Sequence, residues 1–407
     1  MEFRNLTPFS VSHYKMLDKL DHESHVVIMK VGFQLVKVAE GQYRAEIIDK
    51  EQLPLCIQDK YKGRVNNSTV LQESELAPYK PACDVIINAT GYAPGAKPCI
   101  NFSVGVKLNS AERGTLLNKR LYVTGERQLI RRPGGTWYFS EPVSFTSLPL
   151  DYRFAFGGEC VIYPENDKAA KRIPSNYRLT ETQLAQHPEH EHRPIAHEVC
   201  TTNPLGMGYS TPWYLSATEK QAVIAPQIMN ALYPLQAEHF QQLFEGHAEQ
   251  SRPEYQPAGF SIICRSWQPR LTRAGTYDQT WLETRHPYLP DDFDFGYWNC
   301  APEDQQIPFP SSGLEIELTN LTPEGFLKAE LPHHQALLLL RMESGLLLPK
   351  MMLLDTLLID TENMTIATTW RCLVSTTMPI RMLEARYEME PDKLEEKFLL
   401  HREIAHG

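Results

Sequence analysis

The sequence predicts a mainly-β protein in which antiparallel strands form a sandwich or barrel, with long loops and a few short helices. Three observations predict this class. Apolar and polar side chains alternate over residues 25–38, as in a strand with one buried face. Short strand candidates follow one another without intervening helices, which favours antiparallel sheets over a parallel α/β sheet. Thirty prolines against 22 glycines indicate many loops, because proline is poorly tolerated inside helices and central strands.

The strand candidates form two groups, each divided by Gly, Pro and Asn turn signals. After residues 25–38, the first group comprises residues 43–48, 84–90, 100–108, 116–124 and 137–145. The second group comprises residues 314–318, 326–331, 336–342, 351–359 and 365–374. The order of the first group is typical of a meander, so we expect neighbouring candidates there to pair with each other.

A segment of different composition separates the two groups. Residues 164–257 are rich in Glu, Gln, His and Pro, and we interpret them as a loop-rich, partly helical insertion. They divide the chain into an N-terminal β-rich region, residues 1–163, and a C-terminal β-rich region, residues 258–407. Within the insertion, residues 237–250 place three apolar side chains at helical spacing. A short closing helix is predicted to begin at Pro391, and we expect the two β-rich regions to pack together.

Charge and targeting signals narrow the function class. The net charge of −10 argues against nucleic-acid binding, which depends on contacts of Lys and Arg with phosphate, and favours a neutral or basic protein partner. The N-terminus lacks the basic and apolar regions of a signal peptide. The most apolar stretch, residues 346–359, contains Lys350 and Asp355, so no membrane insertion is predicted. Eight scattered cysteines form no C-x-x-C pair and are expected to be reduced, mostly buried thiols in a cytoplasmic protein.

A cluster of histidines is the first candidate for chemistry. His187, His190, His192 and His197 lie close to Cys200, and zinc uses such ligands. Their spacing matches neither a zinc finger nor an H-E-x-x-H motif, and the surrounding residues are typical of a polar loop. We therefore predict no metal site and no cofactor.

An acidic and aromatic segment is the best enzymatic alternative. Residues 291–298 combine Asp291, Asp292 and Asp294 with four aromatic side chains, a pattern that suits a carboxylate-dependent hydrolase acting on a glycan. Aspartates beside Pro and Gly also stabilise turns through hydrogen bonds to the backbone, and we favour that interpretation. The chain contains no G-x-S-x-G elbow, P-loop or dinucleotide-binding motif, so we do not expect an enzyme.

Several unusual strings occur in a fixed order along the chain. They are LAPYKPACDVIINATGYAP from Leu76, LPLDYRFAFGG from Leu148, NPLGMG from Asn203, PAGFSIICRSWQPR from Pro257 and TYDQTWLETRHPYLPDDFDFGYWNCAPEDQQ from Thr276. Together they resemble a bacterial family long catalogued as a domain of unknown function, whose genes lie in type VI secretion clusters beside spike proteins and toxic effectors. The resemblance covers about residues 5–331 and extends loosely to the DT and WR pairs at residues 355–356 and 370–371.

The resemblance implies a non-enzymatic adaptor or co-chaperone. Such a protein binds a type VI secretion effector, or its PAAR/VgrG spike partner, in the cytoplasm and promotes its loading for secretion, in some cases with a second chaperone. This chain departs from the family pattern at Glu126, where aspartate is more usual, and in a longer His-rich stretch. The positions that match the strings, and are therefore candidates for structural or partner-binding roles, are Tyr79, Lys80, Pro81, Asp84, Phe156, Gly157, Gly158, Asn203, Pro204, Trp267, Pro269, Arg270, Tyr277, Asp278, Trp281, Asp291, Phe293, Asp294, Asp304 and Gln305.

The WQPR string allows two interpretations. Trp267 offers a large apolar area and Arg270 five hydrogen-bond donors, so the pair can seat a neighbouring carboxylate loop such as DDFD. The same residue types are enriched as anchors at protein interfaces. We favour the structural role, because loops rich in Gly, Pro and Asp encode backbone geometry.

Overall fold

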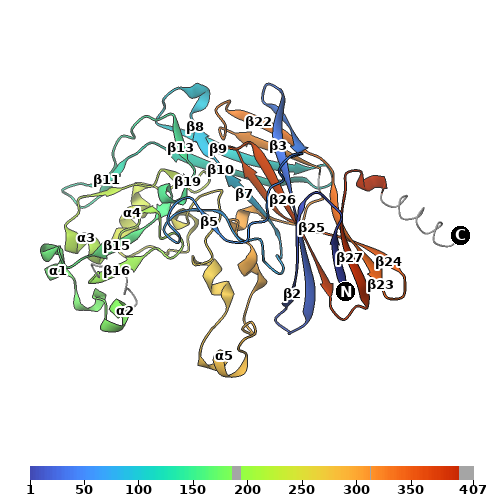
Figure 1. Ribbon diagram of the computed structural model, residues 1–407. Helices are drawn as coiled ribbons and strands as arrows, with labels where there is room; N and C mark the ends of the chain where they lie inside the picture. Colours follow the sequence, from blue (N-terminus) through green and yellow to red (C-terminus); the bar gives the residue numbers. More distant parts are fainter. Residues whose placement is uncertain (186–193, 312, 394–407) are drawn as a thin grey trace.

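A curled sheet of twelve strands forms the centre of the protein (Figure 1), whose computed structural model describes residues 1–185, 194–311 and 313–393. From one edge to the other its strands are β19 (Ile228–Asn230), β10 (Gly114–Thr124), β9 (Asn101–Ser110), β21 (Leu314–Thr319), β22 (Phe326–Leu331), β4 (Gln42–Ile47), β3 (Glu23–Ala39), β26 (Thr365–Ser375), β25 (Leu353–Asp360), β7 (Cys83–Asn88) and β20 (Gln306–Ile307). The twelfth strand, β2 (Ser10–Leu17), pairs with the first part of β3.

Strands from the two β-rich regions alternate in this sheet. β3 pairs with β26, β9 with β21, and β7 with β25, so each region supplies hydrogen-bonding partners for the other. β3 is buried on both faces over most of its length, because one face lies in the main core and the other is covered by loop residues that include Leu53 and Glu75. The two regions therefore share one hydrophobic core.

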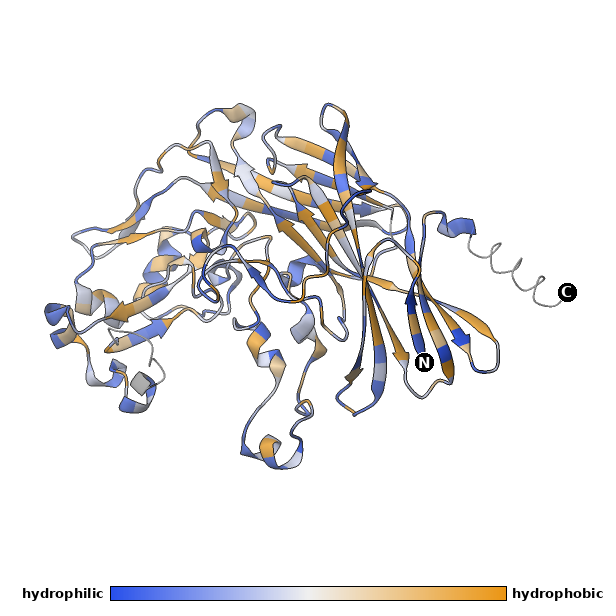
Figure 2. Ribbon diagram, viewed as in Figure 1, coloured by the Kyte–Doolittle hydropathy of each residue, from blue (hydrophilic) through white to orange (hydrophobic). Residues whose placement is uncertain are grey.

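A second sheet packs against part of the first and completes a sandwich. Its strands, in order, are β1 (Glu2–Asn5), β27 (Ile380–Glu388), β23 (Gln335–Met342) and β24 (Leu347–Met351). Leu338 and Leu383 of this sheet belong to the same buried cluster as Met29 and Trp370 of the large sheet. Figure 2 shows the apolar residues that follow the strands of both sheets. Burial of these side chains is the main stabilising contribution to the sandwich.

The middle of the chain forms a smaller body with its own buried cluster, drawn in green and yellow in Figure 1. Its strands are β11 (Gln128–Arg131), β12 (Trp137–Phe139), β14 (Phe156–Gly157), β15 (Glu159–Ile162), β16 (Ala196–Val199), β17 (Met207–Gly208) and β18 (Ala222–Ile224). Its helices are α1 (Asp167–Arg172), α2 (Glu181–Ala185), α3 (Pro212–Thr218) and α4 (Ala237–Phe244). Helix α4 buries Phe240, Leu243 and Phe244 and begins at a capping box in which the backbone N–H of Gln236 donates to His239 Nδ1 (3.0 Å).

The remaining elements are short and lie in the long connections. They are β5 (Lys60–Tyr61), β6 (Val70–Gln72), β8 (Thr90–Tyr92), β13 (Ser147–Pro149), α5 (Gln279–Thr284) and the 3₁₀ helices η1 (Pro94–Ala96), η2 (Tyr152–Phe154), η3 (Ser175–Tyr177), η4 (Pro253–Tyr255), η5 (Arg270–Ala274), η6 (Phe295–Trp298), η7 (Glu303–Gln305) and η8 (Pro391–Lys393). Within the described ranges, no helix is long and apolar enough to cross a membrane. All eight cysteines carry free thiols, and six are buried.

The predicted fold class is confirmed, since 41% of the structure is strand and 15% is helix. The meander prediction holds for two neighbouring pairs, β3 with β4 and β9 with β10. It is wrong for the rest of the first group, because β4, β7 and β9 also pair with β22, β25 and β21 from the far end of the chain. Two of these pairings, β4 with β22 and β7 with β25, are parallel. The helix expected over residues 237–250 ends at Phe244. The strand expected over 137–145 ends at Phe139, and most of the expected closing helix lies outside the described residues.

The shared core predicts that the N-terminal β-rich region cannot fold alone. A fragment ending at residue 163 leaves β3 and β9 without their partners β26 and β21, so we expect an insoluble or unfolded product. Solubility and near-ultraviolet circular dichroism of the fragment provide the test, with co-expression of residues 164–407 as the rescue control. A soluble fragment with a cooperative thermal transition would contradict the shared core.

Candidate functional site

Two of the quoted strings meet at a close backbone crossing. β14 pairs with β17, and Asn203 Nδ2 donates to the carbonyl oxygens of Tyr152 (2.8 Å) and Phe156 (3.0 Å). Gly157 has a φ of 149°, and a Cβ there would lie 2.2 Å from the carbonyl oxygen of Asn203. No larger residue fits this position. The AFGG and NPLGMG strings therefore form one structural unit, which also fixes the loop that precedes Asn203.

Arg270 ties three segments together from a buried position. Its guanidinium donates from Nη1 and Nη2 to the carboxylate of Glu73 (2.7 and 2.6 Å) and from Nε to the carbonyl of Tyr297 (2.7 Å). Burial alone would lower the pKa of Arg270, but the bidentate contact with Glu73 outweighs it and raises the pKa. Trp267 is buried nearby and contacts Tyr152 edge to face, with ring centroids 5.5 Å apart.

The expected pairing of WQPR with the DDFD loop is wrong. The carboxylate that Arg270 binds is Glu73, which stands just before the first quoted string. Asp294 of DDFD instead lies 4.0 Å from Arg273, at the surface. A buried guanidinium requires a carboxylate that is itself shielded from water, and Glu73 meets this condition whereas Asp294 does not.

Asp84 is the centre of a second buried polar group. Its carboxylate accepts hydrogen bonds from Lys80 Nζ (2.8 Å), Asn299 Nδ2 (3.1 Å) and the backbone N–H groups of Cys300 and Ala301 (both 3.1 Å). Burial alone would raise the pKa of Asp84, but Lys80 and these donors hold it below its usual value. The YKPACD string is thereby joined to the NCAP turn that follows the aromatic segment.

The DT and WR pairs extend this group into the sheet. Arg371 Nε donates to Asp355 (2.5 Å), and Arg371 Nη1 donates to the carbonyl oxygens of Glu75 and Ala77. The carboxylate of Glu75 lies 3.1 Å from Lys30 Nζ of β3. Each buried charge thus has an opposite charge beside it, as the cost of desolvation requires.

Lys119 and Gln305 form a third buried polar group. Lys119 Nζ donates to the carbonyl of Gly259, to Asp304 Oδ1 and to Gln305 Oε1, each at 2.7 Å. Gln305 Nε2 donates in turn to the carbonyl oxygens of Val85 (2.7 Å) and Phe260 (2.9 Å). Burial lowers the pKa of Lys119, although Asp304 opposes the shift. These contacts hold the turn at residues 301–305 against the sheet.

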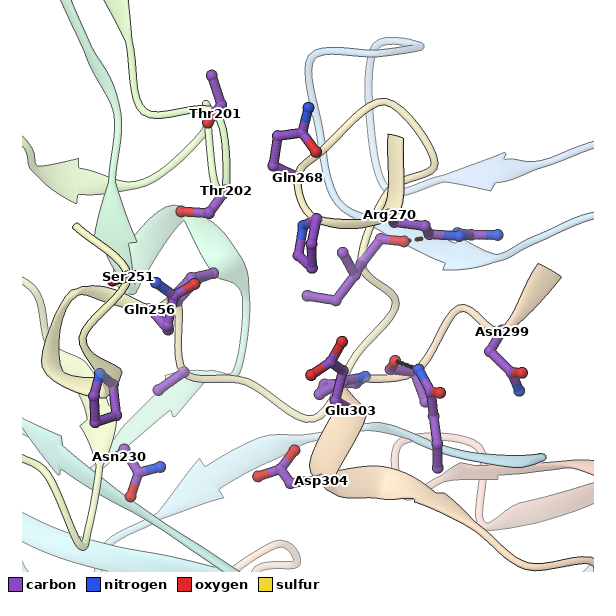
Figure 3. Close-up of a pocket in the computed structure, with 18 of the residues that line it drawn as sticks. Thr201, Thr202, Asn230, Ser251, Gln256, Gln268, Arg270, Asn299, Glu303 and Asp304 are labelled. Atoms are coloured by element: carbon purple, nitrogen blue, oxygen red, sulfur yellow. Dashed lines mark hydrogen bonds between the residues drawn. The ribbon is translucent and has the colours of Figure 1, made fainter. Parts of the chain in front are cut away.

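A cleft of about 720 Å³ opens between the middle body and this turn (Figure 3). Hydroxyl and amide side chains lie along the wall that belongs to the middle body, whereas the opposite wall combines Gln268 with charged residues. The residues labelled in Figure 3 are Thr201, Thr202, Asn230, Ser251, Gln256, Gln268, Arg270, Asn299, Glu303 and Asp304. The three polar groups described above position the wall formed by residues 268–305, and the crossing at Gly157 and Asn203 fixes the loop that carries Thr201 and Thr202 in the other wall. The quoted strings therefore converge on the cleft.

The cleft is chemically suited to binding. Hydroxyl and amide groups both donate and accept hydrogen bonds, and therefore match the N–H and C=O groups of a polypeptide segment. Its volume is in the usual range for ligand sites. No histidine or cysteine is among the described residues that line it, and its one lysine, Lys119, is committed to three oxygen acceptors. The geometry supports recognition of a polar segment.

The carboxylates of the acidic and aromatic segment have roles in local structure. Asp292 accepts from the N–H (2.9 Å) and hydroxyl (2.7 Å) of Thr276, and Asp294 caps η6 by accepting from the N–H of Gly296 (2.8 Å). Asp291 lies at the surface, 3.3 Å from Arg285 Nε. The aromatic rings surround Phe293, which is buried and contacts Phe295 and Tyr297 edge to face. These contacts match the interpretation that the aspartates stabilise turns. The three carboxylates do not face one another across a groove, as a glycan hydrolase would require.

Three other positions of the quoted strings lie apart from the cleft's walls. Tyr277, Asp278 and Trp281 belong to a segment that carries α5 and extends away from the body (Figure 1). Of the remaining positions, Tyr79 contacts Phe295 at a centroid distance of 5.9 Å, and Pro269 lines the cleft.

The histidine cluster falls largely outside the described residues, since His187, His190 and His192 lie between 186 and 193. His197 belongs to β16, where its Nε2 lies 2.8 Å from Glu159, and Cys200 is buried. The described part of the chain contains no group of three His, Cys, Asp or Glu residues that could hold a metal ion.

Comparison with known proteins places the chain in a family. A family model described as an uncharacterized protein conserved in bacteria (DUF2169) matches residues 21–371. The chain belongs to this family. No curated protein and no solved structure matches it. The match includes most of the large sheet, the middle body, the cleft and the segment that carries α5, whereas β1, β2 and β27 lie outside it. The buried polar groups described above all lie within the match.

Several structural residues were not predicted from the sequence. Glu73, Glu75 and Lys119 each compensate a buried charge or fix a loop, but each stands as a single charged residue in a polar stretch or an alternating strand. The only available signal was the position of Glu73 and Glu75 immediately before the YKPACD string. Lys119 resembles any outward-facing lysine of a strand.

Removal of the Arg270 guanidinium is expected to destabilise the protein strongly. Arg270→Ala leaves the Glu73 carboxylate buried without its cation, which lowers the free energy of unfolding by about 3–5 kcal/mol. The matched control is Arg273→Ala, whose partly exposed pairs predict a loss of no more than about 1 kcal/mol. Urea unfolding followed by circular dichroism gives both values. Equal effects of the two substitutions would show that the Arg270 pair has no special role.

The lowered pKa of Asp84 is expected to account for part of the loss of folding stability in acid. Its pKa is lower in the folded than in the unfolded protein, so its contribution to stability is present above the unfolded value of about 4 and is lost as the pH falls through the folded value. We expect the urea midpoint of Asp84→Asn to depend less on pH below about 4 than that of the wild type. Asp291→Asn, at an exposed position, serves as the control that keeps the wild-type dependence. Parallel curves for Asp84→Asn and wild type would refute this assignment.

Proposed function

We propose that this DUF2169 protein is a non-enzymatic adaptor or co-chaperone of type VI secretion. It binds an effector, or the PAAR/VgrG spike protein that carries the effector, in the cytoplasm and promotes loading for secretion. A second chaperone joins the complex where the effector requires one. The link to type VI secretion rests on the resemblance of the ordered strings, and the mode of action rests on the geometry.

The observation that carries this proposal is the convergence of the strings on an open cleft rather than on a reaction centre. Arg270, Asp84 and Gln305 are occupied with contacts inside the protein that hold one wall of the cleft against the sheet, and the backbone N–H of Gln268 in this wall donates to the carbonyl oxygen of Thr201 in the other (2.9 Å). A fixed, solvent-open cleft lowers the entropy lost when a partner segment is bound. On this proposal, the buried residues of the strings hold the surface that binds the partner in place.

The polarity of the cleft indicates what it holds. Hydroxyl and amide side chains such as Thr202, Ser251 and Gln256 offer no charge selectivity, but they satisfy backbone N–H and C=O groups of an extended segment. An adaptor needs this property, because an effector segment that is not yet folded exposes backbone N–H and C=O groups that have no hydrogen-bond partner within the effector.

The glycan-hydrolase alternative gains no support from the positions of its carboxylates. Asp292 and Asp294 are used by turns, and Asp291 points to solvent beside Arg285. The double variant Asp291→Asn, Asp294→Asn is therefore expected to support secretion normally. Loss of activity in a folded double variant would revive the hydrolase.

Secretion of the effector encoded beside the gene tests the adaptor proposal. Deletion of the gene is expected to abolish export of that effector while the effector itself is still made, and the adaptor should stay out of the secreted fraction. Ser251→Trp narrows the cleft and is expected to impair export in the same way. Ser216→Trp, which places the same bulk on the exposed face of α3, is the matched control. Unchanged export after deletion, or abundant secretion of the protein itself, would contradict the proposal.

A further inference from the structure

An arm formed by residues 276–289 extends from the body between η5 and η6 (Figure 1). Its helix α5 contains no buried residue. The arm is nevertheless held in shape by its own contacts. Thr276 Oγ1 donates to Asp292 at the base (2.7 Å), and Trp281 Nε1 donates to the carbonyl of Tyr288 across the tip (2.9 Å).

The arm is also braced against the body. Arg285 Nη1 donates to Asp21 in the β2–β3 turn (3.0 Å), and Asp278 caps α5 by accepting from the N–H of Trp281 (2.8 Å). A segment without a core of its own normally gains little from such ordering, because fixing each residue costs conformational entropy. Here these four polar contacts fix a segment whose apolar side chains remain in water.

Those apolar side chains form the surface of the arm. Tyr277 and Leu282 are each 53% exposed and Tyr288 is 43% exposed. Trp281 packs edge to face against Tyr277, with centroids 4.8 Å apart, so the aromatic rings have limited freedom. Figure 2 shows apolar and polar residues side by side along the arm. Rigid, exposed aromatic side chains in one patch are typical of a site where another protein docks.

The charge around this patch is strongly negative. Residues 276–294 contain five carboxylates (Asp278, Glu283, Asp291, Asp292 and Asp294) and one arginine, so this short stretch accounts for −4 of the chain's net charge of −10. Asp278 and Glu283 are exposed on the arm itself, whereas Asp291 and Asp294 lie at its base beside Arg285 and Arg273. An acidic rim around an apolar patch complements a segment that carries lysine or arginine beside apolar side chains.

We propose that the arm docks a basic segment with apolar side chains in the protein that the adaptor holds. This inference rests on the proposed function, because it assigns a second contact surface to the same partner. Tyr277 and Leu282 provide the apolar contact, and the carboxylates of Asp278 and Glu283 steer and orient the basic residues. An anionic lipid surface or a nucleic acid does not fit, because the acidic arm repels both.

Synthetic peptides test the arm directly on the full-length protein. Three short labelled probes are compared by fluorescence anisotropy: one of lysine and leucine, one of lysine and serine, and one of glutamate and leucine. We expect the lysine–leucine peptide to bind best, with an affinity that decreases as salt increases. The double variant Tyr277→Ser, Leu282→Ser should weaken its binding by at least about tenfold.

Two controls keep the result interpretable. Leu232→Ser, Tyr233→Ser removes a comparable exposed apolar pair outside the arm, at 80% and 47% exposure, and should leave binding unchanged. Leu282→Asn alone adds no charge, keeps the aromatic contacts within the arm and should weaken binding without a change in the thermal midpoint. Equal binding by wild type and both arm variants would overturn the inference. So would equal binding of the lysine–serine peptide, or binding of vesicles of anionic lipid in place of the peptides.

Secretion separates failure of this inference from failure of the adaptor proposal. If deletion of the gene abolishes effector export but the arm variants restore it fully, the adaptor role stands and the arm inference is rejected. If deletion has no effect on export, the adaptor role is rejected, and the peptide comparison still decides whether the arm selects basic, apolar segments.

Discussion

Neutralisation of buried charge is the constraint on which the rest of the structure depends. Four ion pairs lie in the interior: Lys30–Glu75, Lys80–Asp84, Arg270–Glu73 and Arg371–Asp355. An unpaired buried ion costs several kcal/mol, so the loops that supply these residues are restricted to the positions in which every pair is formed. Those loops also carry one wall of the cleft and the base of the arm. These parts of the two proposed contact surfaces are thereby fixed relative to the sheet although they contain little regular secondary structure.

The strands were predictable where their side chains alternate, and their pairing was not. β3, β9, β10, β21 and β22 all lie where the alternation predicted them. β1, β2 and β27 were missed, because short or partly polar strands at the ends of the chain give a weak periodic signal. Pairing of β3 with β26 and of β9 with β21 joins residues that are far apart in sequence, and local patterns contain no information about such contacts.

The candidate site was predictable as a set of positions but not as a geometry. The quoted strings located Asn203, Asp84 and Arg270, and all three are buried hydrogen-bonding residues. Their partners were not predictable, since the sequence did not show that Arg270 faces Glu73 rather than the DDFD loop. The exposure of the arm was likewise not predictable from the sequence. Tyr277 and Leu282 are residue types that usually lie in a core, and only the fold shows that they are exposed to solvent.

On the proposed function, the cleft and the arm are two contact surfaces of an adaptor. Hydrogen–deuterium exchange of the full-length protein, alone and with the effector proposed as its partner, tests this claim most directly. The account predicts protection at residues 276–289 of the arm and at residues 250–257 of the cleft, with little change in the sandwich. Complex formation that protects neither segment, or that protects only the outer strands of the sandwich, would contradict it.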